Sequence, residues 1–190
     1  MEDAELIKQI LAGRHELFTT LVERHQVPLL HFLRRLVSTD EEAFDCAQEA
    51  FLAVYRNLWR YSEAYTFRAW LYTIARNKAL DLYRKRWREV PLTAGEHLVE
   101  QQPGPEEQWL VKEEANRLRQ VLDGLPEHYR QALYLRYKQE LSYEEISVVL
   151  GIPLSRVKTY LHRGKDKLRQ ELERRGLDEG YGQYAGSPVS

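Results

Sequence analysis

Residues 141–168 read LSYEEISVVLGIPLSRVKTYLHRGKDKL, a pattern typical of a short helix, a tight turn and a longer helix. Ser142 and Glu145 have the spacing of a capping box, in which both side chains bond to backbone amides at the start of a helix. Gly151 can take the left-handed turn that ends a helix, and Pro153 suits the start of the next one. The stretch therefore predicts a helix-turn-helix.

The second of these helices is predicted to have one buried and one basic face. At about 100° per residue, Val157, Leu161 and Leu168 share the side expected in the core. The opposite side combines short hydrogen-bonding groups with cations, as major-groove reading and phosphate contact require. Its members are Ser155, Arg156, Lys158, Thr159, His162 and Arg163. The alternative is a solvated face of an ordinary helical bundle.

The chain before residue 90 also predicts helices, because no glycine or proline occurs between Leu29 and Val90. In the helix predicted from Glu41 to Trp59, the buried stripe is expected at Phe44, Ala47, Phe51, Val54 and Leu58. Another face of this helix carries Asp45, Gln48, Glu49 and Arg56. Such an acidic patch would repel DNA and suits a basic protein surface, and simple hydration is the alternative.

A second basic surface is predicted on the helix from Phe67 to Arg88. Its core side is expected at Leu71, Ala75, Ala79 and Leu82. The polar stripe roughly opposite consists of Asn77, Asp81, Arg84 and Arg88. Among the aromatic residues nearby, those expected to fill the core are Trp59, Phe67 and Trp70. Tyr61 and Tyr65 lie in the predicted loop, where their rings could stack on bases of single-stranded nucleic acid.

Composition and punctuation divide the chain into two parts. The 190 residues are 43% hydrophobic and 30% charged, which fits a folded protein. The net charge of −1 conceals two basic blocks, residues 76–88 and 154–169, each with six basic residues against a single acidic one. Prolines and glycines mark a flexible linker at 91–107, and residues 176–190 read as a disordered tail. The prediction is an all-α protein with two small helical domains, 1–90 and 108–175.

Several other classes of protein are not expected. The longest apolar run, Ala50 to Tyr55, is too short to span a bilayer, and the acidic start lacks a secretory signal. The single cysteine, Cys46, excludes a disulfide framework and a cysteine-based zinc cluster, and it suits a reducing cytoplasm. No nucleophile, base or metal ligands cluster in the sequence, and His162 has no such partner nearby. We therefore expect no catalytic residues, metal or cofactor.

Three motifs together resemble the extracytoplasmic-function sigma factors of bacterial RNA polymerase. Residues 45–51, DCAQEAF, with 67–77, FRAWLYTIARN, are similar to their region 2. Residues 125–130, LPEHYR, with 141–168, are similar to region 4, in the order and spacing of the family. The resemblance implies a cytoplasmic, non-enzymatic factor, lacking regions 1 and 3, that directs core polymerase to promoters. It also implies an anti-sigma factor as a partner, one that can hold such a protein near the membrane.

The resemblance further implies roles for particular residues. Asp45, Gln48, Glu49 and Phe51 would bind the clamp helices of the β′ subunit, and the β flap would be a further polymerase contact. The loop from Tyr61 to Thr66 would receive a flipped base of the −10 element. The −10 surface also includes Tyr65, Asn77, Asp81, Arg84 and Arg88. Lys158, Thr159 and His162 would read the duplex −35 element beside Ser155, Arg156 and Arg163. His162 departs from the apolar or aromatic residue of some members, so no promoter sequence is implied.

A stand-alone helix-turn-helix regulator is the alternative function. Such a protein would bind a duplex operator tightly without polymerase. It would leave the acidic patch from Asp45 to Phe51 without a role.

Overall fold

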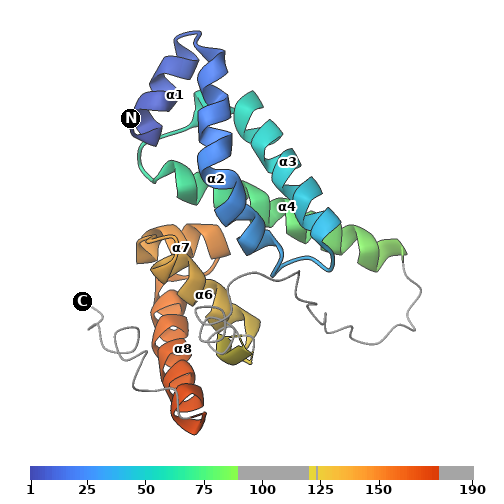
Figure 1. Ribbon diagram of the computed structural model, residues 1–190, viewed down its shortest axis with the longest axis vertical. Helices are drawn as coiled ribbons and strands as arrows, with labels where there is room; N and C mark the ends of the chain where they lie inside the picture. The colour runs from blue at the N-terminus through green and yellow to red at the C-terminus, as the bar shows by residue number, and fades with distance from the viewer. Residues whose placement is uncertain (90–119, 123, 176–190) are drawn as a thin grey trace, which may run out of the picture. The chain divides into compact units, whose positions relative to one another are not determined.

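The computed structural model describes residues 1–89, 120–122 and 124–175, with side chains omitted for 86–89 (Figure 1). Over these ranges the chain is helical and contains no strand, as predicted. The predicted linker, 91–107, and tail, 176–190, lie outside the described residues. The described residues form two compact units. The first contains 1–89 with 144–152, and the second contains those from 120 to 143 with 153–175.

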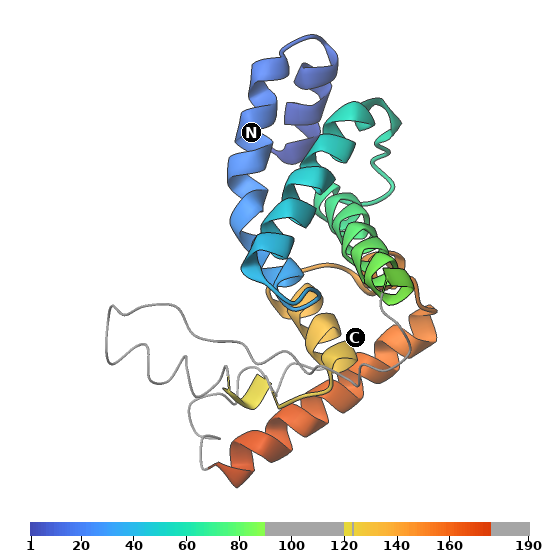
Figure 2. The same cartoon turned by 90° about the vertical axis from the view of Figure 1, so that its right-hand side faces the viewer.

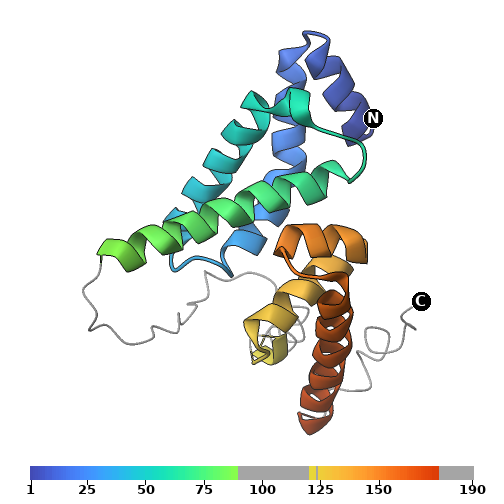
Figure 3. The same cartoon turned by 180° about the vertical axis from the view of Figure 1, so that it is seen from behind.

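The first unit is built from α1 (Asp3–Leu11), α2 (Phe18–Leu33), α3 (Asp40–Arg56) and α4 (Phe67–Glu89). Short 3-10 turns, His15–Leu17 and Leu58–Arg60, precede α2 and follow α3. Nearly all of α7 (Tyr143–Leu150) belongs to this unit as well. Figures 2 and 3 show α1 and α2 side by side, and α2, α3 and α4 pack against one another.

Packing between α2 and α4 forms the centre of this core. The rings of Phe32 and Tyr72 lie 4.9 Å apart, and both side chains are fully buried. Helix α3 begins with a complete capping box, in which Thr39 Oγ1 accepts from the Glu42 amide at 3.2 Å and Glu42 accepts from the Thr39 amide. The helix start is thus fixed locally, while its position is fixed by the apolar face that it buries.

The buried face of α3 differs from the prediction at its start. Ala47, Val54 and Leu58 are buried as expected, but Phe44 is 53% exposed. The buried face runs through Ala43 rather than Phe44, about 100° away around the helix. Trp59 is also wrongly predicted as core, since it is 71% exposed. The α-helix ends at Arg56, so helical spacing does not apply in the following turn.

Within α4 the predicted core side is confirmed at most positions. Leu71, Ala75 and Ala79 are buried, and Leu82 is half-buried. Phe67, at the first position of the helix, is buried as predicted, and Trp70 is half-buried. The expected two-faced character of α4 therefore holds over its first half, where neighbouring helices contact it.

The second unit consists mainly of α6 (Glu127–Tyr137) packed on α8 (Leu154–Arg174), which Figure 3 shows side by side. Val157, Leu161 and Leu168 are buried, as the periodicity predicted. Three residues separate α7 from α8, and Gly151 takes the left-handed conformation with φ +62°. The predicted order of short helix, tight turn and longer helix is confirmed.

Candidate nucleic-acid interface

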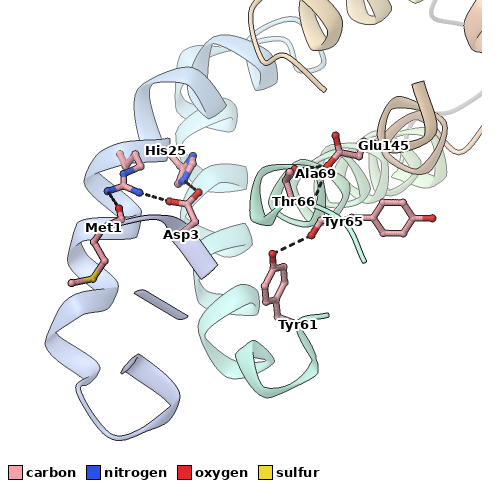
Figure 4. Close-up of polar contacts among 9 residues, drawn as sticks. Met1, Asp3, His25, Tyr61, Tyr65, Thr66, Ala69 and Glu145 are labelled. Atoms are coloured by element: carbon pink, nitrogen blue, oxygen red, sulfur yellow. Dashed lines mark hydrogen bonds and ion pairs between the residues drawn. The ribbon is translucent and has the colours of Figure 1, made fainter. Parts of the chain in front are cut away.

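The loop from Tyr61 to Thr66 is held by one of its own tyrosines. The Tyr61 hydroxyl donates a hydrogen bond to the Tyr65 carbonyl at 3.1 Å (Figure 4). The Tyr61 ring is half-buried and lies 5.5 Å from the ring of Trp70 and 6.1 Å from that of Phe67. Burial, followed by nearby carboxylates, raises the pKa of Tyr61, so its hydroxyl stays a proton donor. Tyr61 thus shapes the loop.

Tyr65 is the more accessible of the two predicted stacking residues. It is 42% exposed, and its ring points away from Tyr61 in Figure 4. An exposed aromatic ring on a loop held from behind offers a face on which an unpaired base can stack. The structure therefore distinguishes the two tyrosines, because Tyr61 supports the loop and Tyr65 presents an exposed ring.

Thr66 forms the junction between this loop and α4. Its Oγ1 accepts a hydrogen bond from the Ala69 amide at 3.2 Å, as an N-cap does. Its backbone N–H and its Oγ1 donate to Glu145 Oε1 of α7, at 2.8 and 2.6 Å. Sequence reasoning missed this contact, because the two residues are 79 positions apart and Glu145 was interpreted only as part of a capping box, which stays a prediction.

The predicted polar stripe lies further along α4, the helix that follows the loop. Asn77, Asp81 and Arg84 are exposed, as a surface for nucleic acid requires. Asp81 and Arg84 form an ion pair one turn apart, at 3.2 Å. This ion pair partly neutralises the positive charge of Arg84. Arg88 lies on α4, but its side chain is outside the described part of the chain.

On α3 the candidate protein-binding residues separate into exposed and buried groups. Asp45, Gln48 and Glu49 are exposed, whereas Phe51 is only 7% exposed and belongs to the core. The exposed apolar side chains are instead Phe44 and Leu52, four residues to either side of Gln48 on the same helix face. Sequence reasoning missed this exposed apolar pair because helical periodicity assigned Phe44 to the buried stripe.

This acidic face of α3 forms an ion pair with α4 and lies near a buried cysteine. Glu49 forms an ion pair with Lys78 of α4 at 3.1 Å. The buried thiol of Cys46 lies beneath the patch. Burial raises the pKa of Cys46, and the carboxylates of Glu49, Glu42 and Asp45 raise it further. The face is therefore an exposed acidic surface beside a buried thiol that keeps its proton.

The predicted reading face of α8 is exposed throughout, and it comprises Ser155, Arg156, Lys158, Thr159, His162 and Arg163. Thr159 Oγ1 donates to the Ser155 carbonyl at 3.0 Å, within the helix. His162 Nδ1 lies 3.0 Å from Asp166 Oδ2, one turn further on. A carboxylate at Nδ1 orients the imidazole and leaves Nε2 for a base edge. The expectation that His162 has no partner nearby in the sequence is therefore wrong, and the i+4 spacing of Asp166 is a recognisable signal.

Two negative findings concern the described ranges. No three His, Cys, Asp or Glu side chains there lie close enough to hold a metal ion. None of the helices in those ranges is both long and apolar enough to cross a membrane.

Comparison with known proteins identifies two conserved regions of one family in the chain. Residues 21–89 match the family model of sigma-70 region 2, and residues 115–168 match that of sigma-70 region 4. The ECF RNA polymerase sigma factor SigW of Bacillus subtilis is 34% identical over 176 residues, covering 87% of this chain and 94% of SigW.

Solved structures agree with this assignment. CnrH, in complex with the cytosolic domain of CnrY, is 26% identical with a TM-score of 0.62, and the alignment covers 90% of this chain and 97% of CnrH. RpoE of Bartonella quintana, in complex with the anti-sigma factor NepR, has a TM-score of 0.66 at 23% identity, which shows the same fold. Its alignment covers 82% of this chain and 96% of RpoE.

Proposed function

The chain belongs to the extracytoplasmic-function family of RNA polymerase sigma factors, and we propose that it divides promoter recognition between the surfaces described above. As a sigma factor it binds core polymerase and directs transcription initiation at promoters. In our proposal it contributes binding and base recognition, and the polymerase supplies the catalysis. The proposed domains are residues 1–90 for the −10 element and 108–175 for the −35 element.

The observation that carries the proposal is the Tyr61–Thr66 loop. Tyr61 is fixed by its hydrogen bond to the Tyr65 carbonyl, and the exposed Tyr65 ring precedes α4, the helix that carries the polar stripe. A stacking ring followed by Asn77 and Arg84 suits a single strand, whose bases are unstacked and whose phosphates are accessible. We assign to this surface the capture of an unpaired −10 base.

The α8 face is assigned to duplex DNA at −35. Its exposed Lys158, Thr159 and His162 combine hydrogen-bonding groups with positive charge on one helix face, which is the chemistry of major-groove reading. Arg156 and Arg163 flank this row and would contact phosphates, which fix the register of the helix. The length of α8, from Leu154 to Arg174, gives the row a continuous rigid support.

The exposed face of α3 is assigned to core polymerase. Asp45, Gln48 and Glu49 would meet a basic surface, such as the clamp helices that the family resemblance implies. Phe44 and Leu52 supply exposed apolar area beside them. We propose these two residues as direct contacts in place of Phe51, which is buried. An apolar centre with a charged border is the usual composition of a protein interface.

An anti-sigma factor is the proposed controlling partner. CnrH, which resembles this chain over most of its length, was solved with the cytosolic domain of CnrY. A comparable partner would act by covering surfaces that polymerase or DNA needs. Because it would work with core polymerase, we also place the protein in the cytoplasm, where a membrane-bound partner could hold it.

Run-off transcription with purified core polymerase and a promoter library tests the function. Transcripts from a subset of promoters sharing a −35 and a −10 element are expected only when the chain is added. Tight binding of the isolated chain to a duplex operator, with no polymerase-dependent transcripts, would instead favour a stand-alone helix-turn-helix regulator.

A further inference from the structure

Helix α1 precedes the part of the chain that the region 2 family model matches, which starts at residue 21. It is nevertheless well anchored, because Leu6, Ile7 and Ile10 are each only 2% exposed. Three buried apolar residues in a nine-residue helix fix it firmly on its neighbours. The contacts that its polar residues make indicate what this helix does.

Asp3 connects α1 to a buried histidine. Asp3 Oδ2 lies 2.7 Å from His25 Nε2, and Asp3 Oδ1 lies 2.5 Å from Arg24 Nη1 (Figure 4). His25 is 5% exposed, and its ring centroid lies 5.3 Å from that of Phe67, the first residue of α4. The carboxylate therefore holds the imidazole against the start of α4.

The same contacts continue into the loop before α4. The Phe67 ring meets the ring of Tyr61, whose hydroxyl holds the Tyr65 carbonyl. A continuous series of contacts thus runs from Asp3 through His25, Phe67 and Tyr61 to Tyr65. Each step joins residues that are packed or hydrogen-bonded, so the position of α1 and that of the loop are physically connected.

A second, direct contact joins α1 to the loop. Lys8 Nζ lies 3.0 Å from Glu63 Oε1, and Glu63 stands between Tyr61 and Tyr65 in the sequence. Within the loop, hydrogen bonds join Tyr61 to Tyr65 and the Ala64 amide to Ser62 Oγ. Since residues 61–66 belong to no helix, their conformation depends on the elements packed against them.

We propose that α1 positions the Tyr61–Thr66 loop for capture of the unpaired −10 base, with Asp3 and Lys8 as positioning residues. The inference rests on the role proposed above for that loop. A loop already held in its binding conformation loses less conformational entropy when the base enters. Loosening α1 should therefore impair opening of the −10 element and leave −35 reading unchanged.

Open-complex formation by the full chain with core polymerase tests the proposal on two templates. One is a duplex promoter, and the other is the same promoter with its −10 region mismatched and already open. Asp3→Ala and Lys8→Glu should slow opening of the duplex by about three- to tenfold. The loss should be smaller on the mismatched template, where no base has to be unpaired.

Two further variants sharpen the result. Exchanging both charges, Lys8→Glu with Glu63→Lys, should restore opening on the duplex, because the ion pair is re-formed in the opposite sense. Glu2→Ala is the matched control, because Glu2 is exposed at the start of the same helix and its side chain makes no capping hydrogen bond. Both surface changes leave the buried α1 residues intact, so they decide the matter even if Asp3→Ala fails to fold.

Tyr65→Ala separates the two levels of the proposal. If it slows duplex opening while Asp3→Ala and Lys8→Glu do not, or if these two slow both templates equally, the positioning role of α1 is overturned. Equal slowing on both templates would mean that the variants contain less folded protein. Urea unfolding would detect that loss of stability. If Tyr65→Ala leaves opening unchanged, the role of the loop itself fails.

Discussion

Gly164 of α8 faces Leu133 of α6 so closely that a Cβ at Gly164 would lie 3.2 Å from Leu133 Cδ1. Tyr129 Cβ would be at the same distance. The Tyr129 atom is joined directly to the backbone of α6, so it cannot move away without moving the helix. The glycine is therefore required here for close approach of two helices and not for an unusual φ.

Enlarging Gly164 should weaken this helix pair. Gly164→Ala removes a poor helix former, a gain of about 1 kcal/mol, but overpacking costs about 1–3 kcal/mol. We expect a net loss in the free energy of unfolding, and a larger one for Gly164→Val. Hydrogen exchange at the Leu133 and Leu161 amides measures it. Exposed Lys167→Ala is the control, and unchanged protection in Gly164→Ala would show that α6 gives way easily.

Asp3 should make the first unit sensitive to acid. Burial acts to raise the pKa of Asp3, but hydrogen bonds and charges from His25 and Arg24 outweigh it and hold that pKa below its usual value. A carboxyl group whose pKa is lower in the folded state stabilises the fold at pH values above its unfolded-state pKa. This stabilisation is lost as the pH falls through the folded-state pKa. The stabilisation should therefore decline below about pH 4.

Removing that carboxylate gives the corresponding measurement. Asp3→Ala leaves His25 Nε2 buried without this partner and should cost about 1–3 kcal/mol at neutral pH. The difference in the free energy of unfolding between Asp3→Ala and wild type should shrink as the pH falls below about 4. Urea unfolding at a series of pH values measures this difference. If the difference stays constant with pH, the contribution of Asp3 to stability does not depend on its ionisation.

The acidic face of α3 should govern binding to core polymerase. Asp45→Lys should lower the affinity by about tenfold at low salt, and by less at high salt, because such charges act through screened attraction. Exposed Glu23→Lys on α2 makes the same charge change elsewhere in the unit and is the control. Fluorescence titration of core polymerase measures both. Equal effects of the two variants would mean that net charge, and not this face, is responsible.

Phe44 gives a second, uncharged test of the same face. Phe44→Ser removes an exposed apolar side chain and should weaken core binding with little change in the free energy of unfolding. Phe51→Ser, by contrast, should destabilise the fold, since Phe51 is in the core. Loss of about 3 kcal/mol or more of stability in Phe51→Ser would be typical of a large core residue. Normal core affinity of folded Phe44→Ser would exclude Phe44 from the interface.

His162 and Asp166 should act on the same base of the −35 element. Asp166 contacts Nδ1, so Asp166→Ala should loosen the imidazole and weaken the base preference that His162→Ala abolishes. A lost base contact is worth about 1–3 kcal/mol of discrimination. Competition binding with −35 variants measures it, and exposed Lys167→Ala is the control for a lost charge on the same helix. Changed −10 opening with unchanged −35 preference would contradict the assignment.

Much of the local structure could be predicted from the sequence because it depends on neighbouring residues. The absence of glycine and proline, the turn at Gly151 and the spacing of Val157 and Leu161 all act within a few turns of helix. The reading face of α8 could be predicted for the same reason, since exposure there is simply the complement of a buried stripe. The split between the two tyrosines of the −10 loop was not predicted.

The prediction was wrong wherever a neighbouring element decided the outcome. Phe44 and Phe51 are both large apolar residues on α3, and only packing against α2 and α4 determines which is buried. Trp59 is exposed because the α-helix ends before it. Periodicity indicates that a helix has an apolar side, but a shift of one residue turns that side by about 100°.

Local patterns in the sequence were enough to predict that the described residues form helices and which charged faces these helices carry, because hydrogen bonding and side-chain spacing along one helix are local. The contacts of Asp3 with His25, of Thr66 with Glu145 and of Gly164 with Leu133 arise from packing between helices. These pairs are 22, 79 and 31 positions apart in the sequence. No local pattern encodes such contacts, because each depends on how separate helices bury their apolar faces together.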